Sequence, residues 1–269
     1  MTSTNAAQGN PPRLLFECEG SIAKLTLNRA DAANALDLST ARELMRAAIT
    51  CDENEAIRCV LLTGTGRFFC AGGDVRSLGA AGASLGALLK EMTAYFHAAV
   101  TRFMRMNKPL IIAVNGIAAG AGFSLALVGD LVLAARTAQF TSSYTMLGLS
   151  CDGGLSWILP RLMGLRRAQE LLLTNRTLSA EEAMHLGLVT RTTDAEALSA
   201  EASTLAQELA AGPTAAYGKL RNLLLCSSES SLETQLESES RAIAQSSRTP
   251  HGQEGIAAFA SRRKPDFSR

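Results

Sequence analysis

The octapeptide Asn-Gly-Ile-Ala-Ala-Gly-Ala-Gly occupies residues 115–122 and directly follows the apolar run Leu110–Val114. A similar turn, Phe-Phe-Cys-Ala-Gly-Gly-Asp at residues 68–74, comes shortly after the apolar run Cys59–Thr63. Short apolar runs that end at glycine are typical of buried strands. Because glycine has no side chain, each turn could offer an unobstructed main-chain N–H. Two such groups could hold the oxygen of a substrate carbonyl, an arrangement called an oxyanion hole.

Strands and helices alternate on both sides of these turns. Upstream, Arg13–Glu19 and Ile22–Asn28 are predicted to form a β-hairpin, because both runs are rich in β-forming residues and a glycine separates them. Helices are predicted over Leu38–Cys51, Leu85–Met106 and Gly120–Gly129. The apolar run Leu131–Ala135 predicts a further buried strand. This alternation predicts an α/β fold with layered packing.

The last third of the chain is predicted to be mostly helical. Ser179 opens a capping-box pattern that predicts a helix over Ala180–Leu186. A glycine and a proline precede a predicted helix over Thr214–Cys226, and another is expected to open at Ser230. We therefore divide the chain into a disordered N-terminal segment at residues 1–12, an α/β core at 13–200 and a helical C-terminal region at 201–269.

Composition limits the class of protein. The chain has 269 residues, of which 47% are apolar, enough for one large domain or one domain with a small appendage. Its 26 basic and 25 acidic residues are interspersed, so no nucleic-acid partner is expected. Met1–Pro12 is polar and Ile117–Gly129 is short, so neither a signal peptide nor a membrane partner is predicted. Six cysteines without a C-x-x-C pair predict a cytoplasmic protein with free thiols and no structural metal.

Several short motifs occur in an order that resembles the crotonase, or enoyl-CoA hydratase/isomerase, superfamily. They are the two glycine turns, Leu27–Arg29, Asn34–Leu36, Leu159–Arg161, Thr174–Arg176 and Glu181–Ala183. The resemblance implies a crotonase-like spiral of ββα units with a helical C-terminal region that assembles homotrimers or dimers of trimers. It also implies an acyl-CoA thioester as the partner. Coenzyme A would arrive as part of the substrate, with no separate cofactor.

The resemblance also implies the residues of the site. The two oxyanion donors would be the N–H groups of Gly73 and Ala121, and the residues agree with this: glycines allow close approach of a ligand, and Ala121 begins a predicted helix. The implied substrate-binding positions are Ala33, Ala35, Ala71, Gly73, Asp74, Val75, Gly120, Ala121 and Leu147. Asp74 also fits a helix cap, because a short helix is expected directly after it.

A hydratase of this family uses two glutamates to activate water, and this chain has neither. The two positions hold Ser124 and Tyr144, and a neutral hydroxyl is a poor base near pH 7. Tyr144 is expected to line the acyl pocket or to donate a hydrogen bond. Asp152 resembles the acidic residue of several family isomerases, so the resemblance favours double-bond isomerisation with Asp152 as acid and base. The alternative is that Asp152 caps a helix that starts at Gly153.

Three other functions stay open at this point. Hydration is one, despite the missing glutamates. The 4-chlorobenzoyl-CoA dehalogenase branch of the family implies another, with Asp152 as nucleophile and His97 as base. A histidine on the helix predicted around His97 is, however, more often a packing residue. The third is a member of the fold that only binds acyl-CoA or RNA, although the balanced charge argues against RNA.

Overall fold

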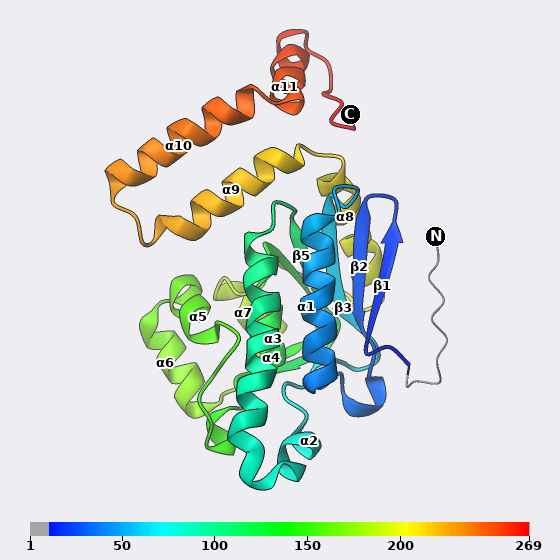
Figure 1. The fold of residues 1–269 in the computed structure, drawn as a ribbon, viewed down its shortest axis with the longest axis vertical. Helices are drawn as coiled ribbons and strands as arrows, with labels where there is room; N and C mark the ends of the chain where they lie inside the picture. Colours follow the sequence, from blue (N-terminus) through cyan, green and yellow to red (C-terminus); the bar gives the residue numbers. More distant parts are fainter. Residues whose placement is uncertain (1–10, 269) are drawn as a thin grey trace.

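Three successive strand–strand–helix units form the centre of the fold (Figure 1). The computed structural model describes residues 11–268. The first unit comprises β3 (Cys59–Gly64), β4 (Phe68–Cys70), α2 (Val75–Ala80) and α3 (Leu85–Arg105). The second comprises β5 (Leu110–Val114), β6 (Ile117–Ala119) and α4 (Ala121–Ala126), and the third β7 (Leu131–Ala135), β8 (Gln139–Thr141) and α5 (Leu155–Met163). The predicted spiral of ββα units is confirmed.

The two strands of each unit enter different sheets. The first sheet has the order β1-β2-β3-β5-β7-β10, in which β1 (Leu14–Glu19) pairs antiparallel with β2 (Ile22–Leu27) and the other pairs are parallel. The second sheet has the order β4-β6-β8-β9. Strands β9 (Leu178–Ser179) and β10 (Arg191–Thr193) come from the chain after the third unit. Strands β4 and β6 lie within the two glycine-rich stretches and are parallel neighbours. The glycines that follow each strand therefore leave the same edge of the second sheet.

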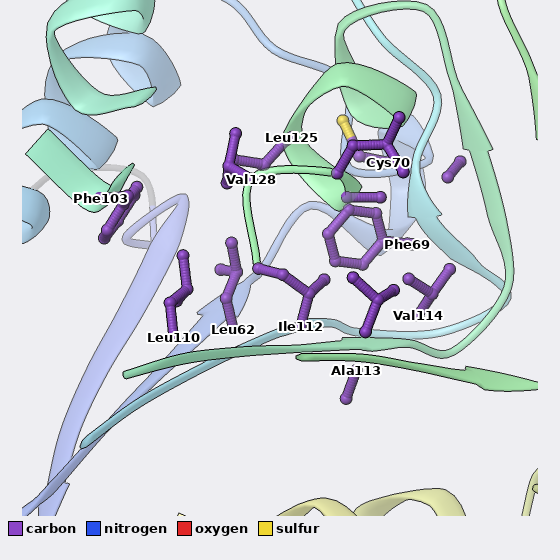
Figure 2. Close-up of a cluster of buried hydrophobic side chains, with 14 of the residues drawn as sticks. Leu62, Phe69, Cys70, Phe103, Leu110, Ile112, Ala113, Val114, Leu125 and Val128 are labelled. Atoms are coloured by element: carbon purple, nitrogen blue, oxygen red, sulfur yellow. The ribbon is translucent and has the colours of Figure 1, made fainter. Parts of the chain in front are cut away.

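The hydrophobic core lies between the two sheets. Figure 2 shows Leu62 and Ile112 of the first sheet on the side where Phe69 of β4 lies, and all three side chains are fully buried. Ala113 follows Ile112 in the chain and points to the opposite face of the sheet, the face of β5 against which α8 (Leu198–Ala210) packs. This alternation follows from the two-residue period of a strand. The glycine turns therefore start from a rigid, well-packed base.

Helices α1 (Leu38–Glu53) and α3 pack side by side against the sheets (Figure 1). Helix α1 begins after Asp37, whose side chain accepts a hydrogen bond from the amide of Thr40 at 2.8 Å. At its other end, the ammonium group of Lys108 donates to three carbonyl oxygens, those of Cys51, Asp52 and Asn54. The last carbonyls of a helix lack partners within the helix, so Lys108 ties the end of α1 to the segment that enters β5.

The predicted helix over Gly120–Gly129 is wrong at its end. Helix α4 stops at Ala126. The amide of Asp130 donates to the carbonyl of Leu110 at 2.9 Å, and a carboxylate oxygen of Asp130 accepts from the amide of Leu110 at 2.7 Å. These two bonds attach the chain to the first sheet, so the helix cannot continue toward β7.

Among the remaining elements, helices that are long or that have a capping residue are predicted well. The capping box at Ser179 is confirmed and starts α7 (Ala180–His185). The helix expected to open at Ser230 begins at Leu232, because Ser231 is the residue that accepts from the amide of Thr234. The sequence missed the strands of the second sheet, which have only two or three residues each and are too short to show a period.

The last three helices form an arm that extends from one end of the core (Figure 1). They are α9 (Thr214–Ser227), α10 (Leu232–Ser247) and α11 (Pro250–Ala260). By contrast, α6 (Leu165–Thr174) packs against α5, and α8, which spans the boundary predicted at residue 200, packs against the first sheet. Large apolar side chains of the arm are exposed: Leu220, Leu224, Leu232, Leu236, Ile243, Ile256 and Phe259.

Three further predictions concern the N-terminal segment, the membrane and the cysteines. The predicted disorder of residues 1–12 falls mainly on residues 1–10, which lie outside the described residues. Within residues 11–268, no helix has both the length and the apolar character needed to cross a bilayer. All six cysteines are free thiols in the structure.

Candidate active site

The two glycine turns approach each other directly. Gly72 has φ +93°, a left-handed conformation that side chains rarely adopt. A Cβ atom at Gly72 would lie 2.8 Å from the carbonyl oxygen of Ala119 and 3.3 Å from the amide nitrogen of Ala121. Glycine is therefore required at position 72 by both conformation and space, and its absence of a side chain brings the two turns into contact.

The amide of Gly73 is left unpaired by the hydrogen bonds on either side of it. Leu36 donates its N–H to the carbonyl of Gly72 at 2.7 Å and accepts from the amide of Asp74 at 2.8 Å. In such a parallel bridge, the residue between the two bonded positions directs its own N–H to the opposite side. Gly73 occupies that place, and its N–H has no hydrogen-bond partner within residues 11–268.

The amide of Ala121 is unpaired for a different reason. Ala121 is the first residue of α4, and the first N–H groups of a helix have no acceptor within it. The preceding residue, Gly120, has φ +52° and donates its own N–H to the carbonyl of Thr141 at 3.1 Å. Strand pairing thus ends at Gly120, and the described part of the chain offers no acceptor to Ala121.

Both unpaired amides border one cavity. Its volume is about 110 Å³, and its walls are mostly apolar. Helix α3 lines it with Leu89, Met92, Thr93 and Phe96, and α2 with Val75 and Leu78. Ser143, Tyr144 and Asp152 supply its polar side chains besides Thr93, and Asp152 is the one carboxylate among the described lining residues. An apolar group can therefore lie in this cavity with a polar end near the amides and Asp152.

Asp152 is held by the two residues that stand at the hydratase glutamate positions. The hydroxyl of Tyr144 donates to Oδ1 of Asp152 at 2.5 Å. The Ser124 hydroxyl donates to the main-chain carbonyl of Asp152 at 2.9 Å and lies 3.1 Å from the Tyr144 hydroxyl oxygen. The other carboxylate oxygen, Oδ2, has no hydrogen-bond partner within residues 11–268. One oxygen of the carboxylate is thus held by Tyr144, and no described residue holds the other.

Tyr144 is a permanent hydrogen-bond donor in this arrangement. Burial raises the pKa of its phenol well above the ordinary value, and the nearby charge of Asp152, together with the hydrogen bond between them, raises it further. The phenol therefore keeps its proton across the pH range in which proteins work. Tyr144 therefore positions Asp152 as a hydrogen-bond donor.

The proposal that Asp152 caps a helix starting at Gly153 is wrong. Gly153 and Gly154 have φ +62° and +84°, and α5 begins only at Leu155, with Gly154 in the capping position. The Asp152 side chain caps no helix. Its main-chain carbonyl instead accepts from the amide of Leu155 at 3.2 Å. The two left-handed glycines turn the chain sharply, and the Asp152 carboxylate stays at the cavity wall.

His97, on α3, contacts this turn from outside the cavity that Asp152 lines. Its Nε2 accepts a hydrogen bond from the amide of Gly153 at 3.0 Å. The imidazole lines a neighbouring cavity of about 360 Å³, shared with Trp157 and Glu229, and is not among the residues that line the cavity of Asp152. The nitrogen that a base would use is therefore already engaged with the main chain.

The other predicted binding residues fall into two groups. Ala71, Val75, Gly120 and Leu147 line the cavity together with the two amides. Ala33, Ala35 and Asp74 are not among its described lining residues. They support the first glycine turn instead: the Ala33 carbonyl accepts from Ala71, the Ala35 carbonyl accepts from Arg29, and the Asp74 carboxylate pairs with Arg29 at 2.9 Å. Asp74 also caps α2, as the alternative interpretation predicted.

Of the cavity-lining residues on α3, Leu89, Met92 and Thr93 were not predicted. Together with Phe96 they follow one another at intervals of three, one and three residues, the spacing of a single helix face. This periodicity was visible in the sequence, but it does not distinguish a face that packs against the core from one that lines a cavity. Ser143, which has φ +54°, carried no such signal.

Known proteins are similar to this chain in sequence and fold over most of their length. Residues 17–269 match the profile of the family described as Enoyl-CoA hydratase/isomerase. The chain is 37% identical to the 1,2-epoxyphenylacetyl-CoA isomerase of Escherichia coli, over 95% of this chain and 98% of that protein. It is 32% identical to 4-chlorobenzoyl coenzyme A dehalogenase-2 of an Arthrobacter species, over 90% and 88% respectively. The crystal structure of an enoyl-CoA hydratase from a Polaromonas species matches with a TM-score of 0.90 and 36% identity, covering 94% of this chain and 98% of that one.

Proposed function

The chain belongs to the enoyl-CoA hydratase/isomerase family, and from this premise we propose that it moves the double bond of an enoyl-CoA thioester. The observation that carries the proposal is the composition of the cavity wall. Two unpaired amides and Asp152, the one carboxylate among the described lining residues, border a mostly apolar space. An oxyanion hole with one acid–base group is the minimum that proton transfer between two carbons of an enolate requires.

The two amides are proposed to hold the thioester oxygen. Charge on that oxygen appears only when a proton leaves the acyl chain, so donors fixed in advance stabilise the intermediate more than the substrate. Gly73 and Ala121 are suited to this because their N–H groups are unpaired and their positions are set by a sheet bridge and a helix start. The acyl chain would occupy the apolar space along α3.

Asp152 is proposed to carry the proton. Its carboxylate takes a proton from C2 of a 3-enoyl-CoA, and the electron pair of the broken bond forms a double bond between C1 and C2. The negative charge passes to the thioester oxygen. When the carbonyl re-forms, the C1–C2 pair becomes the C2–C3 double bond, and the former C3–C4 pair takes the proton back from Asp152 at C4. No atom is gained or lost, and coenzyme A acts only as part of the substrate.

Tyr144 and Ser124 support this choice over hydration. Both hydroxyls are engaged with Asp152, and neither is a base that could activate water near pH 7. Dehalogenation ranks below isomerisation because it needs a base to release the product from Asp152. The residue implied for that task, His97, lies against another cavity and accepts from Gly153.

We also propose that the chain acts as a homotrimer or a dimer of trimers. The C-terminal arm exposes apolar side chains on all three of its helices, including Leu224 and Phe259, which are 66% and 86% exposed. A surface of this kind marks a protein interface more often than a free surface. Sedimentation equilibrium of the full chain tests this proposal, and a monomer at micromolar concentration contradicts it.

A direct assay distinguishes the candidate reactions. The purified full chain is incubated with a 3-enoyl-CoA, with crotonyl-CoA and with 4-chlorobenzoyl-CoA. We expect the absorbance of a conjugated enoyl thioester to increase with the first substrate, little loss of absorbance with the second and no chloride release with the third. Rapid hydration of crotonyl-CoA or release of chloride would contradict the proposal. Binding of all three esters without turnover would favour a non-catalytic member of the fold.

A further inference from the structure

We infer that His97 is a positioning residue, which holds the turn of Asp152 through the main-chain amide of Gly153. The inference rests on the proposed role of Asp152 in proton transfer. It goes beyond that role because it assigns a function to a side chain outside the cavity. The observation behind it is the hydrogen bond from the Gly153 amide to Nε2 of His97, at 3.0 Å.

The turn that carries Asp152 needs such support. Gly153 and Gly154 both have positive φ, and glycine moves between conformations more readily than any other residue. The Asp152 carbonyl is held by Ser124 and Leu155, and its carboxylate by Tyr144. The amide of Gly153 is the next polar group along the chain, and His97 is its partner among the described residues. Without that bond, the Gly153 amide would have no hydrogen-bond partner among the described residues.

Packing around Gly153 makes the position of Asp152 depend on that of α3. A Cβ atom at Gly153 would lie 2.5 Å from Cε1 of Phe96 and 2.7 Å from Cβ of Ser124. Gly153 is therefore enclosed between α3 and α4, with Phe96 and His97 as consecutive residues on α3. Phe96 forms part of the cavity wall and His97 holds the amide behind it. The same turn of helix α3 thus forms part of the proposed acyl pocket and holds the segment that carries the proposed acid–base residue.

The direction of this hydrogen bond separates positioning from base catalysis. Nε2 accepts from an N–H, so its lone pair is occupied and the ring proton is on Nδ1 in the neutral imidazole. A base acting on a ligand would need that lone pair, and the ring lines the neighbouring cavity instead. A side chain that only accepts at the same point should then replace histidine, whereas an apolar one should not.

Two substitutions test this distinction. Glutamine at position 97 (His97→Gln) can place an amide oxygen near the site of Nε2, whereas leucine (His97→Leu) cannot accept a hydrogen bond. With 3-enoyl-CoA, we expect His97→Leu to lower kcat about 10- to 100-fold with KM within about threefold, since a displacement of about 1 Å can cost about 100-fold in rate. We expect His97→Gln to keep kcat within about threefold. His185→Leu, on α7, is the matched control and should leave kcat unchanged.

Two kinetic results would overturn the inference. An equal loss in His97→Gln and His97→Leu would mean that the imidazole itself is required. Full activity in His97→Leu would mean that the turn needs no support from position 97.

Hydrogen exchange of the Gly153 amide, followed by NMR, gives a readout that does not depend on activity. We expect protection in the wild type and in His97→Gln, and faster exchange in His97→Leu. Equal exchange in all three proteins overturns the inference. If the wild type moves no double bond, the proposed function fails, and the exchange rates still decide whether His97 holds the turn.

Discussion

The two sides of the cavity are built from different parts of the chain. On one side, Gly73 and Ala121 present main-chain N–H groups whose positions follow from a sheet bridge and a helix start. On the other side, Tyr144 and Asp152 present side chains joined by a hydrogen bond. The main-chain side does not titrate and its donors belong to no side chain, whereas a single replacement on the side-chain side changes the available chemistry. We infer that the first side serves the shared chemistry of the family and the second selects the reaction.

Removing the charge of Asp152 should have the largest effect. In Asp152→Asn the side chain keeps its size but cannot take a proton, so we expect kcat for 3-enoyl-CoA to fall about 1,000-fold or more. The affinity for the ester should stay within about tenfold because the amides are intact. Steady-state kinetics and calorimetric titration measure the two quantities. Asp31→Asn, at an exposed position, is the matched control. Full activity in Asp152→Asn would remove this residue from the mechanism.

Deleting one main-chain donor is the corresponding change on the other side. Ala121→Pro removes the N–H at the first helical position, where proline is well tolerated. We expect kcat to fall about 100- to 1,000-fold, as for other lost oxyanion donors. Ala121→Gly, which keeps the N–H, should stay near the wild-type rate. If a folded Ala121→Pro protein turned over as fast as Ala121→Gly, the second glycine turn would not be part of an oxyanion hole.

Tyr144→Phe should have a smaller effect because it removes a support and leaves the carboxylate. The ring stays in place, while Oδ1 of Asp152 loses its donor at 2.5 Å. We expect kcat to fall about tenfold, which corresponds to the loss of roughly one hydrogen bond to a charged group. The rate of conjugated-enoyl formation, measured beside that of Asp152→Asn, places the two residues in order. A fall as large as that of Asp152→Asn would make Tyr144 the proton carrier.

The difference between the two sides also explains what could be predicted from the sequence. Glycine-rich turns after apolar runs are local patterns, so the sequence alone could suggest both turns as parts of one site, whereas Gly73 and Ala121 were implied as the donors by the resemblance to the family. The parallel pairing of β4 and β6, which brings the turns together, was not predicted, because strands of three residues are too short to show a period. The end of α4 could not be predicted because it depends on hydrogen bonds between Asp130 and Leu110, 20 residues apart.

The side-chain site was only partly predictable because its contacts join distant segments. Asp152 was singled out by its resemblance to an acidic residue of family isomerases, and Ser124 and Tyr144 by what they replace. That these hydroxyls hold Asp152 depends on the left-handed glycines at 153 and 154, which the sequence alone did not place. The bond between His97 and Gly153 spans 56 positions and follows no local pattern.

Asp74 provides the last contrast, as a carboxylate that directly follows the unpaired amide of Gly73 and yet has a structural role. It accepts from the amides of Arg76 and Ser77 and pairs with Arg29 at 2.9 Å. Burial by itself raises the pKa of Asp74. The hydrogen bonds from Arg29, Ser77 and Arg76, together with the charge of Arg29, outweigh it, so the pKa lies below the ordinary value of 3.8. The folded state therefore favours the charged form.

Asp74→Asn should have the smallest effect, and on stability more than on rate. Asparagine caps helices about as well as aspartate, so the main loss is the partly buried ion pair with Arg29, worth about 1 kcal/mol near pH 7. Because the pKa of Asp74 is lower in the folded state than in the unfolded state, its charged carboxylate stabilises the folded protein at pH values above the unfolded-state pKa. This contribution is lost as the pH falls through the folded-state pKa. Urea unfolding should thus show a gap in unfolding free energy between the wild type and Asp74→Asn near pH 7. This gap should shrink below about pH 3.8. A gap that persists in acid, or a loss of kcat beyond about twofold, would place Asp74 in the site rather than beneath it.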